Sequence, residues 1–241
     1  MFLHLKNILT LDEIHTARAL LDADDAPWVD GRLSAGGQAL AHKRNEQLRQ
    51  DSAPSQQLRA LVLAALQRDA LFFSAALPKK IFNPLFNRYS GESNFYGDHV
   101  DGAVLRSKSP DQWVRSDISC TLFLAEPHEY DGGELRIQEA HSERLVKLPA
   151  GDMVLYPSSS VHQVAPVTRG ARLASFFWIE SMVRSTEQRL LLWNMDMNLL
   201  QLRSRIGATG NTNIDTNIDI NPAVVGLTGT YHNLLRMWAD T

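Results

Sequence analysis

The spacing of apolar residues along the first third of the chain predicts two amphipathic helices. Apolar positions recur every three or four residues over 10–23 and again over 55–73. The first run opens with Thr10-Leu-Asp-Glu13, a capping box in which the Thr10 hydroxyl and the Glu13 carboxylate each satisfy a free backbone N–H. Residues 28–54, between the two runs, are polar and rich in glycine, so we expect a loop with one short strand there.

Beyond Pro78 the pattern changes to short apolar or alternating runs, which are typical of β-strands. Glycine, proline, aspartate and serine separate these runs, for example at Asp131-Gly-Gly133 and Arg169-Gly170. Strands at this spacing, with turn residues between them, indicate an antiparallel sandwich or barrel. The predicted strands are 81–89, 117–124, 133–137, 145–148, 153–156, 163–167 and 172–180.

The helical period returns near the C-terminus, over 184–203 and more briefly over 231–239. The polar stretch between these runs holds a four-residue repeat, Thr-Asn-Ile-Asp, at 212–215 and 216–219. Two such copies are too short for a solenoid, so we expect a flexible linker near 204–220. The helix over 184–203 is expected to pack on the core or to form the face of a homodimer. The predicted organisation is an N-terminal helical segment packed on the core (1–77), a β core (78–181) and a C-terminal helical extension (182–241).

Composition fits a globular chain and excludes several classes of protein. Apolar residues make up 44% and charged residues 21% of the 241 positions, close to the globular average. The net charge of −3 leaves no dominant basic surface for nucleic acid or anionic lipid. No apolar run approaches the roughly 18 residues of a membrane span, and the N-terminus lacks the pattern of a signal peptide. With Cys120 as the single cysteine there is no internal disulfide, so we expect a cytoplasmic protein with neither membrane nor nucleic-acid partners.

Three of the candidate metal ligands form a pattern with a known chemistry. In His99-Val-Asp101 the imidazole and the carboxylate are two residues apart, a spacing that places both on one face of a strand. His162 follows 61 residues after Asp101, at the head of an apolar run. Two histidines and one carboxylate form the ligand set of non-haem Fe(II) oxygenases, which leaves open coordination positions for other ligands.

A rival pair, His141-Ser-Glu143, has the same spacing but lies in a very polar stretch. Only 19 residues separate Glu143 from His162, fewer than two strands and a long loop usually need. We therefore interpret this pair as part of a solvated turn.

Arg172 is a candidate for binding an anion. It follows His162 by ten residues, across the Arg169-Gly170 turn, so adjacent antiparallel strands would bring Arg172 alongside His162. An arginine that enters an apolar strand is costly unless its charge finds a partner. A dicarboxylate substrate would supply that partner through a bidentate pair. An internal aspartate or glutamate, or solvent, would do so equally well, and the residues alone leave this open.

Several longer strings carry a resemblance to a known family. They are Asn87-Arg-Tyr-Ser-Gly-Glu-Ser-Asn-Phe-Tyr-Gly-Asp-His-Val-Asp101, Arg115-Ser-Asp-Ile-Ser-Cys-Thr-Leu-Phe-Leu124, Tyr130-Asp-Gly-Gly-Glu-Leu135, Lys147-Leu-Pro-Ala-Gly-Asp152, Val154-Leu-Tyr-Pro157, Val164-Ala-Pro-Val-Thr-Arg-Gly-Ala-Arg172 and Phe176-Phe-Trp-Ile179. Together they are similar to the bacterial PKHD-type hydroxylases, a group of Fe(II)/2-oxoglutarate dioxygenases of the prolyl and lysyl hydroxylase kind that is linked to iron uptake. The similarity is continuous from about Pro78 to Leu200 and looser outside that range.

The resemblance implies a mainly β fold with flanking helices, the double-stranded β-helix or jelly roll. It implies that His99, Asp101 and His162 bind Fe(II), and that Arg172 and Tyr89 bind the far carboxylate of 2-oxoglutarate. It further implies hydroxylation of a substrate with O2 and decarboxylation of 2-oxoglutarate to succinate and CO2, supported by L-ascorbate, and a role in iron uptake. The sequence departs from the family pattern at Ser116, where threonine is more usual, and in the linker around 213–217, which looks inserted.

Other functions remain open on the residues alone. A non-catalytic sensor of metal or 2-oxoglutarate could use the same scaffold, because a fold does not fix a function. A cupin-type metalloenzyme without 2-oxoglutarate usually needs a richer histidine cluster, and an interaction module could use the helix over 184–203. The primary substrate is also open, since neither a peptide nor a small molecule such as a siderophore is specified by the sequence.

Overall fold

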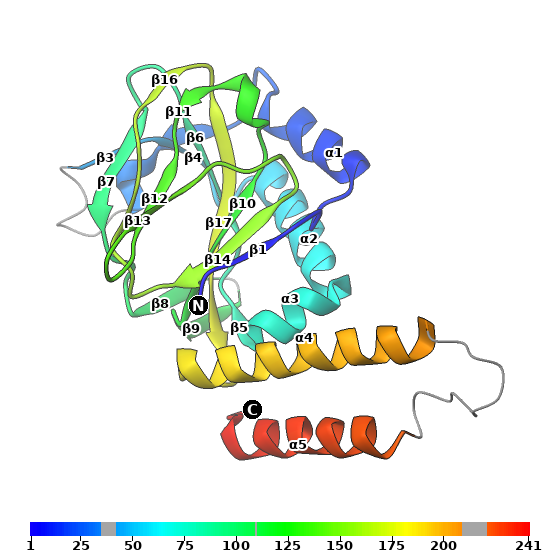
Figure 1. Cartoon of the computed structure of the whole chain (residues 1–241). Helices are drawn as coiled ribbons and strands as arrows, with labels where there is room; N and C mark the ends of the chain where they lie inside the picture. The colour runs from blue at the N-terminus through cyan, green and yellow to red at the C-terminus, as the bar shows by residue number, and fades with distance from the viewer. Residues whose placement is uncertain (35–41, 109, 209–220) are drawn as a thin grey trace.

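The computed structural model describes residues 1–34, 42–108, 110–208 and 221–241. Two antiparallel sheets pack against each other, and helices cover the outer face of the larger sheet (Figure 1). The prediction of a mainly β jelly roll with flanking helices is therefore confirmed. The 212–219 repeat lies outside the described residues.

The larger sheet has eight strands and carries the helices on one of its faces. Its strands follow the order β1-β14-β10-β17-β6-β4-β2, with β5 paired to β17 beside this path. In this order the strands are β1 (Leu3–Leu5), β14 (Met153–Pro157), β10 (Ile118–Phe123), β17 (Arg172–Ser181), β6 (Leu85–Tyr89), β4 (Glu46–Leu48), β2 (Trp28–Asp30) and β5 (Pro78–Ile81).

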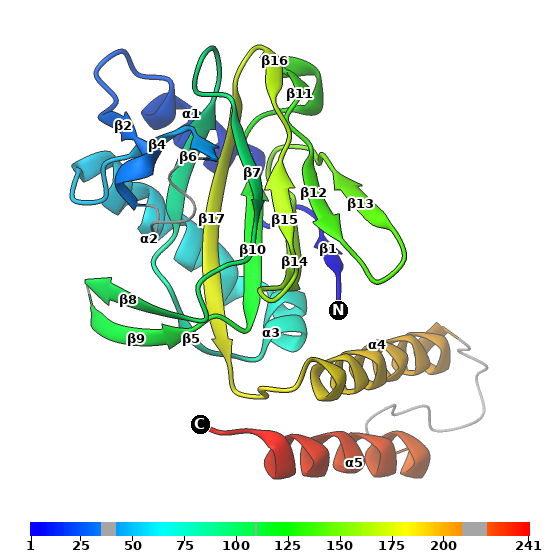
Figure 2. The same cartoon turned by 90° about the vertical axis from the view of Figure 1, so that its left-hand side faces the viewer.

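The smaller sheet has five strands, in the order β13-β12-β15-β7-β3. These strands are β13 (Glu143–Val146), β12 (Leu135–Gln138), β15 (His162–Val164), β7 (Phe95–His99) and β3 (Lys43–Arg44). Figure 2 shows β7, β15 and β12 side by side, in front of the larger sheet. Two further ribbons complete the β structure, namely β8 (Val104–Lys108) with β9 (Asp111–Arg115), and β11 (Asp131–Gly132) with β16 (Val167–Arg169).

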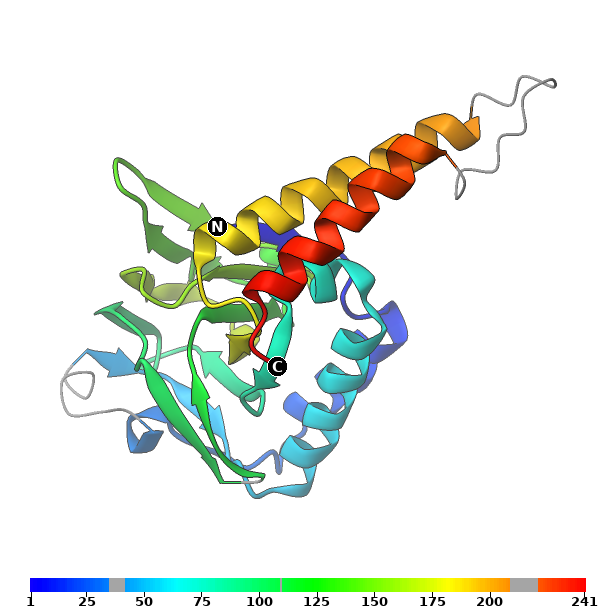
Figure 3. The same ribbon diagram turned by 90° about the horizontal axis from the view of Figure 1, so that it is seen from below.

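The helices occupy two places in the fold. Near the N-terminus, α1 (Leu11–Leu21), α2 (Ala53–Arg68) and α3 (Ala70–Ala76) cover the larger sheet (Figure 1). Near the C-terminus, α4 (Thr186–Ala208) and α5 (Pro222–Trp238) run side by side along one end of the molecule (Figure 3). Two short 3-10 helices lie at Gly31–Ser34 and Pro127–Glu129.

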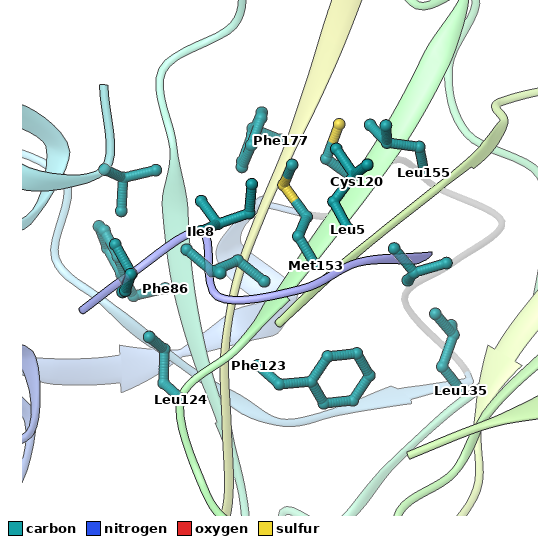
Figure 4. Close-up of a cluster of buried hydrophobic side chains, with 14 of the residues drawn as sticks. Leu5, Ile8, Phe86, Cys120, Phe123, Leu124, Leu135, Met153, Leu155 and Phe177 are labelled. Carbon is teal, nitrogen blue, oxygen red and sulfur yellow. The ribbon is translucent and has the colours of Figure 1, made fainter. Parts of the chain in front are cut away.

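The main core lies between the larger sheet and the N-terminal helices. Alternate residues of the central strands, such as Cys120, Met153, Leu155 and Phe177, point to this side, as Figure 4 shows. Every second residue of a strand faces one side, so the intervening residues of the same strands are left to face the smaller sheet. That second face carries the candidate site.

The C-terminal helices form a second, smaller hydrophobic cluster. Leu192 and Leu199 of α4 are buried with Tyr231 of α5 against Leu77 and Val183. Of the two alternatives for the 184–203 helix, packing on the body of the protein is the one observed, and the helix continues to Ala208. Its role in a homodimer stays a prediction.

Three features of the N-terminal part differ from the predicted elements. The predicted helix over 55–73 is two helices, because Asp69 ends α2 and its carboxylate accepts a 2.6 Å hydrogen bond from the Phe72 N–H at the start of α3. The predicted loop over 28–54 contains three short strands, β2, β3 and β4, which join the edges of the two sheets. The first 77 residues therefore supply strands as well as helices, and the division into 1–77, 78–181 and 182–241 stays a prediction.

The predicted strands also divide at prolines. The run over 81–89 is split by Pro84 into β5 and β6, and the run over 163–167 is split by Pro166 into β15 and β16. Proline has no N–H to donate, so it interrupts a central ladder. The predicted C-terminal helix over 231–239 is shorter than the observed one, because α5 begins at Pro222, directly after its N-cap Asn221.

Gly170 fixes the turn that delivers Arg172 to the start of β17. Its φ is +71°, and a Cβ placed there would lie 2.0 Å from the carbonyl oxygen of Glu129. Neither the conformation nor the contact tolerates a side chain.

We expect Gly170→Ala to lower the free energy of unfolding by roughly 1–3 kcal/mol, the cost of holding a residue other than glycine in a left-handed conformation. Chemical denaturation would measure this loss. The control is Gly226→Ala, because a Cβ at Gly226 in α5 meets nothing within 4 Å. An unchanged denaturation midpoint for Gly170→Ala would contradict the role of this turn.

Candidate active site

A cavity of about 660 Å³ lies between the two sheets and contains all five predicted site residues. His99 and His162 line it from the smaller sheet, and Asp101 follows β7. Arg172 and Tyr89 line it from β17 and β6 of the larger sheet.

The two imidazoles are brought together by strand pairing. His162 of β15 lies directly opposite His99 of β7 in the antiparallel ladder, and the ring centroids are 4.2 Å apart. The prediction that His99 and Asp101 share one strand is wrong, because β7 ends at His99. Asp101 lies just beyond this end, where its Oδ2 is 3.7 Å from His162 Nε2. One ligand atom from each of the three residues lies within 4.8 Å of the others. Among the described residues this is the one cluster of histidine, cysteine and carboxylate side chains with the geometry to hold a metal ion.

Hydrogen bonds orient the two imidazoles. The Nδ1 atom of His99 is 2.8 Å from the Gly97 carbonyl oxygen, and the Nδ1 atom of His162 is 3.0 Å from that of Ser160. A carbonyl accepts only from a protonated nitrogen, so each ring carries its hydrogen on Nδ1 and leaves the Nε2 lone pair available. Burial, together with the neighbouring His162, lowers the pKa of His99 to about 4. Its ring therefore stays neutral, as a metal ligand must be, near neutral pH.

Ser119 holds the carboxylate from the opposite sheet. Its hydroxyl donates a 2.6 Å hydrogen bond to Asp101 Oδ2 and lies 2.8 Å from the Ser158 hydroxyl. Ser119 is buried on β10, among apolar residues. This contact was not predicted, although the alternation of Ser119 and Thr121 with apolar neighbours in a buried strand indicates a polar face.

Aromatic rings enclose the imidazoles. Tyr96 stacks on His99 with ring centroids 3.6 Å apart, and Tyr156 meets His162 edge-on at 5.1 Å. Burial raises the pKa of Tyr96 to about 12, so it is a neutral phenol. These contacts restrict the rotation of both imidazoles.

Arg172 is fully buried at the far end of the cavity, with 1% of its surface exposed. It lies opposite Tyr89 in the ladder, and its guanidinium carbon is 5.4 Å from the Tyr89 ring centroid and 5.3 Å from that of Phe123. Its Nε has no hydrogen-bond partner, and no carboxylate of the described chain forms an ion pair with it. The described residues therefore form no internal salt bridge with Arg172, which was one of the alternatives that the sequence left open.

The predicted strand adjacency of Arg172 and His162 is wrong. β15 pairs with β12 and β7, whereas β17 pairs with β10, β6 and β5. The intervening β16 pairs with β11 and carries the chain from one sheet to the other. Arg172 and His162 thus face the same cavity from opposite walls.

The rival pair lies in an exposed hairpin, as interpreted, with His141 in the connection and Glu143 at the start of β13. His141 and Glu143 are exposed at the tip of the β12–β13 hairpin, and Glu143 lies 3.6 Å from Arg136 in an ion pair. Neither residue lines the cavity.

The donor set fits ferrous iron, because two neutral imidazole nitrogens and one carboxylate oxygen on one side of a cavity form a facial triad. The unpaired buried guanidinium fits a carboxylate. The site can therefore hold a metal ion at one end and an anion at the other, with room for organic molecules between them.

No helix of the described residues is both long and apolar enough to cross a membrane.

Comparisons with known proteins place the chain in one family. Residues 84–180 match the model of the 2OG-Fe(II) oxygenase superfamily, and residues 187–240 match that of the PKHD-type hydroxylase C-terminal domain. A PKHD-type hydroxylase of Variovorax paradoxus is 57% identical over 240 residues, and one of Nitrosomonas europaea is 53% identical over 241 residues. In both cases the match covers 100% of each chain.

Solved structures agree on the fold. A prolyl hydroxylase of Trichoplax adhaerens, solved with a peptide fragment of hypoxia inducible factor, superposes with a TM-score of 0.52 at 15% identity, over 74% of this chain and 82% of that one. The alpha ketoglutarate dependent carbocyclase SnoK of nogalamycin biosynthesis gives a TM-score of 0.52 at 14% identity, over 76% and 80%. The chain belongs to the PKHD-type hydroxylases of the 2OG-Fe(II) oxygenase superfamily.

Proposed function

We propose that this hydroxylase is a dioxygenase that uses Fe(II), 2-oxoglutarate and O2 to hydroxylate its substrate. The observation that carries the proposal is the shared cavity, which places the cluster of His99, Asp101 and His162 opposite the buried, unpaired Arg172. A metal ion and a dicarboxylate would each find a matching set of groups there.

His99, Asp101 and His162 would hold the iron on one side and leave its other side open to the cavity. When bound, iron supplies the activation of O2 that couples hydroxylation of a C–H bond to decarboxylation of 2-oxoglutarate, with succinate and CO2 as products. The protein contributes the fixed Nδ1–H tautomers of both imidazoles and the orientation of Asp101 by Ser119. Such hydrogen bonds set the direction and basicity of metal ligands.

Arg172 and Tyr89 would bind the far carboxylate of 2-oxoglutarate. The guanidinium offers a planar pair of N–H donors, and the phenol, whose pKa burial raises to about 12, stays protonated and able to donate. With this carboxylate anchored, the other end of the molecule points back across the cavity toward the metal cluster.

The remaining elements of the proposal follow from the resemblance. We propose that L-ascorbate supports turnover by keeping iron ferrous, that the protein works in the cytoplasm, and that it serves iron uptake or iron homeostasis. The substrate is a small molecule or a peptide, and a homodimer formed through the C-terminal helices is the proposed assembly.

Replacing Asp101 with alanine should abolish iron-dependent decarboxylation of 2-oxoglutarate, because two imidazoles alone leave the metal without its anionic ligand. Succinate release would be measured against the wild type. Glu143→Ala, in the exposed rival pair, is the matched control and should retain activity. Wild-type turnover by Asp101→Ala would show the assignment of the metal site to be wrong.

Replacing Arg172 with alanine should raise the KM for 2-oxoglutarate by roughly 10- to 100-fold, the loss expected for a charged hydrogen bond. Arg172→Lys should recover only part of this loss, because lysine keeps the charge without the planar fork. Arg169→Ala removes an exposed arginine paired with Asp131 and serves as the control. An unchanged KM in Arg172→Ala would remove Arg172 from this role.

Ser119→Ala should weaken metal binding by roughly 10-fold or more, as is typical when a hydrogen bond to a metal ligand is removed. Titration of the metal-free protein with Fe(II) under anaerobic conditions would measure the dissociation constant. Ser142→Ala, in the exposed hairpin turn, should bind iron like the wild type. Equal affinities in all three proteins would mean that Ser119 does not position Asp101.

A further inference from the structure

A lysine lies inside the cavity, on a wall that the proposed iron and 2-oxoglutarate sites do not use. Lys43 belongs to β3, the edge strand of the smaller sheet, and lies opposite Tyr96 of β7 in the ladder. Only 5% of its surface is exposed, and it lines the cavity. An ammonium group in such a place costs free energy unless an anion accompanies it.

The ammonium group lies close to the metal cluster. Its Nζ atom is 5.2 Å from the centroid of the Tyr96 ring, and the same ring stacks on the His99 imidazole with centroids 3.6 Å apart. Tyr96 therefore connects Lys43 to the metal cluster through two successive contacts.

The charges of these groups act on one another. Burial is the main cause that lowers the pKa of Lys43 to about 8, and the negative charge of Asp101 opposes this effect. Burial and His162 are the main causes that lower the pKa of His99, and the positive charge of Lys43 adds to them. Among the described residues, Arg172 is not one of the groups that shift the pKa of Lys43. Lys43 thus acts at the metal end of the cavity, whereas Arg172 lies at the far end.

The site would carry an excess positive charge once iron and 2-oxoglutarate are bound. Among the described residues, the charged side chains that line the cavity are Lys43, Asp101, Arg106 and Arg172. Arg106 forms a bidentate ion pair with the exposed Asp111 of β9. The charges of Fe(II) and Arg172 are balanced by those of Asp101 and the two carboxylates of 2-oxoglutarate. The charge of Lys43 remains, so a substrate with one negative charge would make the loaded cavity neutral.

The metal end of the cavity also has an apolar wall. Trp178 of β17 pairs with Ser119 of β10, the residue that donates to Asp101, and meets Phe82 edge-on with ring centroids 5.3 Å apart. Both aromatic residues line the cavity and are partly exposed. Trp178 follows Arg172 by six residues, or about 20 Å along the strand, so this wall lies at the metal end and away from the anchor of 2-oxoglutarate.

We propose that Lys43 binds an acidic group of the primary substrate, and that this substrate is an organic acid whose carboxylate lies beside the metal cluster. A lysine ammonium has three N–H donors on a flexible stem, so it can turn toward a carboxylate that enters the cavity. The rest of the substrate would lie against Phe82 and Trp178. This inference rests on the proposed function, because it assigns the part of the same cavity that 2-oxoglutarate leaves free.

The 2-oxo acid end of 2-oxoglutarate is the competing source of this carboxylate. It points toward the metal cluster when Arg172 holds the other end, so it would be an alternative partner for Lys43. The experiment therefore measures the binding of 2-oxoglutarate as well as that of other acids.

Three pairs of an acid and its amide serve as probes of different size: acetate and acetamide, butanoate and butanamide, and benzoate and benzamide. Their dissociation constants would be measured at pH 7 by NMR titration of the full-length protein loaded with Co(II) and saturating 2-oxoglutarate, which prevents turnover. In the wild type we expect the acid of at least one pair to bind roughly 10- to 100-fold more tightly than its amide, the gain expected for a charged hydrogen bond.

In Lys43→Met, which keeps the length of the side chain and removes its charge, this preference should fall to about one. Lys43→Gln is a second neutral variant with the same expected result, should the first not fold. Lys43→Arg keeps the charge and should retain part of the preference, which separates the loss of the charge from a change of structure. Lys6→Met removes an exposed lysine and is the matched control, so it should behave like the wild type. The dissociation constant of 2-oxoglutarate should stay near the wild-type value in every variant.

The outcomes distinguish this inference from the proposed function. Wild-type protein that fails to bind 2-oxoglutarate in a metal-dependent manner overturns both. With normal 2-oxoglutarate binding, the inference alone is overturned if no acid binds more tightly than its amide, or if the neutral variants keep the preference for the acid. Weaker binding of 2-oxoglutarate in the neutral variants, with the preference unchanged, would assign Lys43 to the 2-oxo acid end and overturn the inference as well.

Discussion

The register between β15 and β7 is the constraint on which the site depends. It sets His162 directly opposite His99, so two imidazoles from segments more than sixty residues apart share one face of the smaller sheet. A shift of the strand register by one residue would turn one imidazole to the opposite face of the sheet. The ligand atoms would then no longer lie together. The carbonyls of Gly97 and Ser160, each two residues before its histidine, then fix both rings with their Nε2 atoms free. The two imidazoles are thus positioned by strand pairing, whereas Asp101 lies just beyond the end of β7 and accepts a hydrogen bond from Ser119.

The larger sheet completes the site from the opposite wall. Its helix-facing residues make the core, while its other face supplies Ser119 to Asp101 and presents Arg172 at the far end. In each central strand, one set of alternate residues therefore packs in the core, and the other set faces the site. This arrangement separates the two roles, because a change on the cavity face leaves the packing against α1, α2 and α3 in place.

Much of this could be predicted from the sequence, because the ligand pattern is local and chemically specific. His99-Val-Asp101, the later His162 and Arg172 are all found in the cavity, and the turn glycines separate the strands as expected. What could not be predicted depends on which strands are neighbours. The sequence spacing suggested that Arg172 follows His162 in one sheet, yet β16 moves the chain to the other sheet. Pro166 marks the end of β15, but it does not tell which strands the following segment pairs with.

Iron K-edge X-ray absorption of the anaerobic protein with Fe(II) and 2-oxoglutarate tests the central claim most directly. The account predicts iron with two imidazole ligands and otherwise oxygen ligands, and loss of the imidazole scattering when His99 and His162 are both replaced. Iron coordinated by oxygen alone in the wild type, or an unchanged spectrum in that double variant, would contradict it.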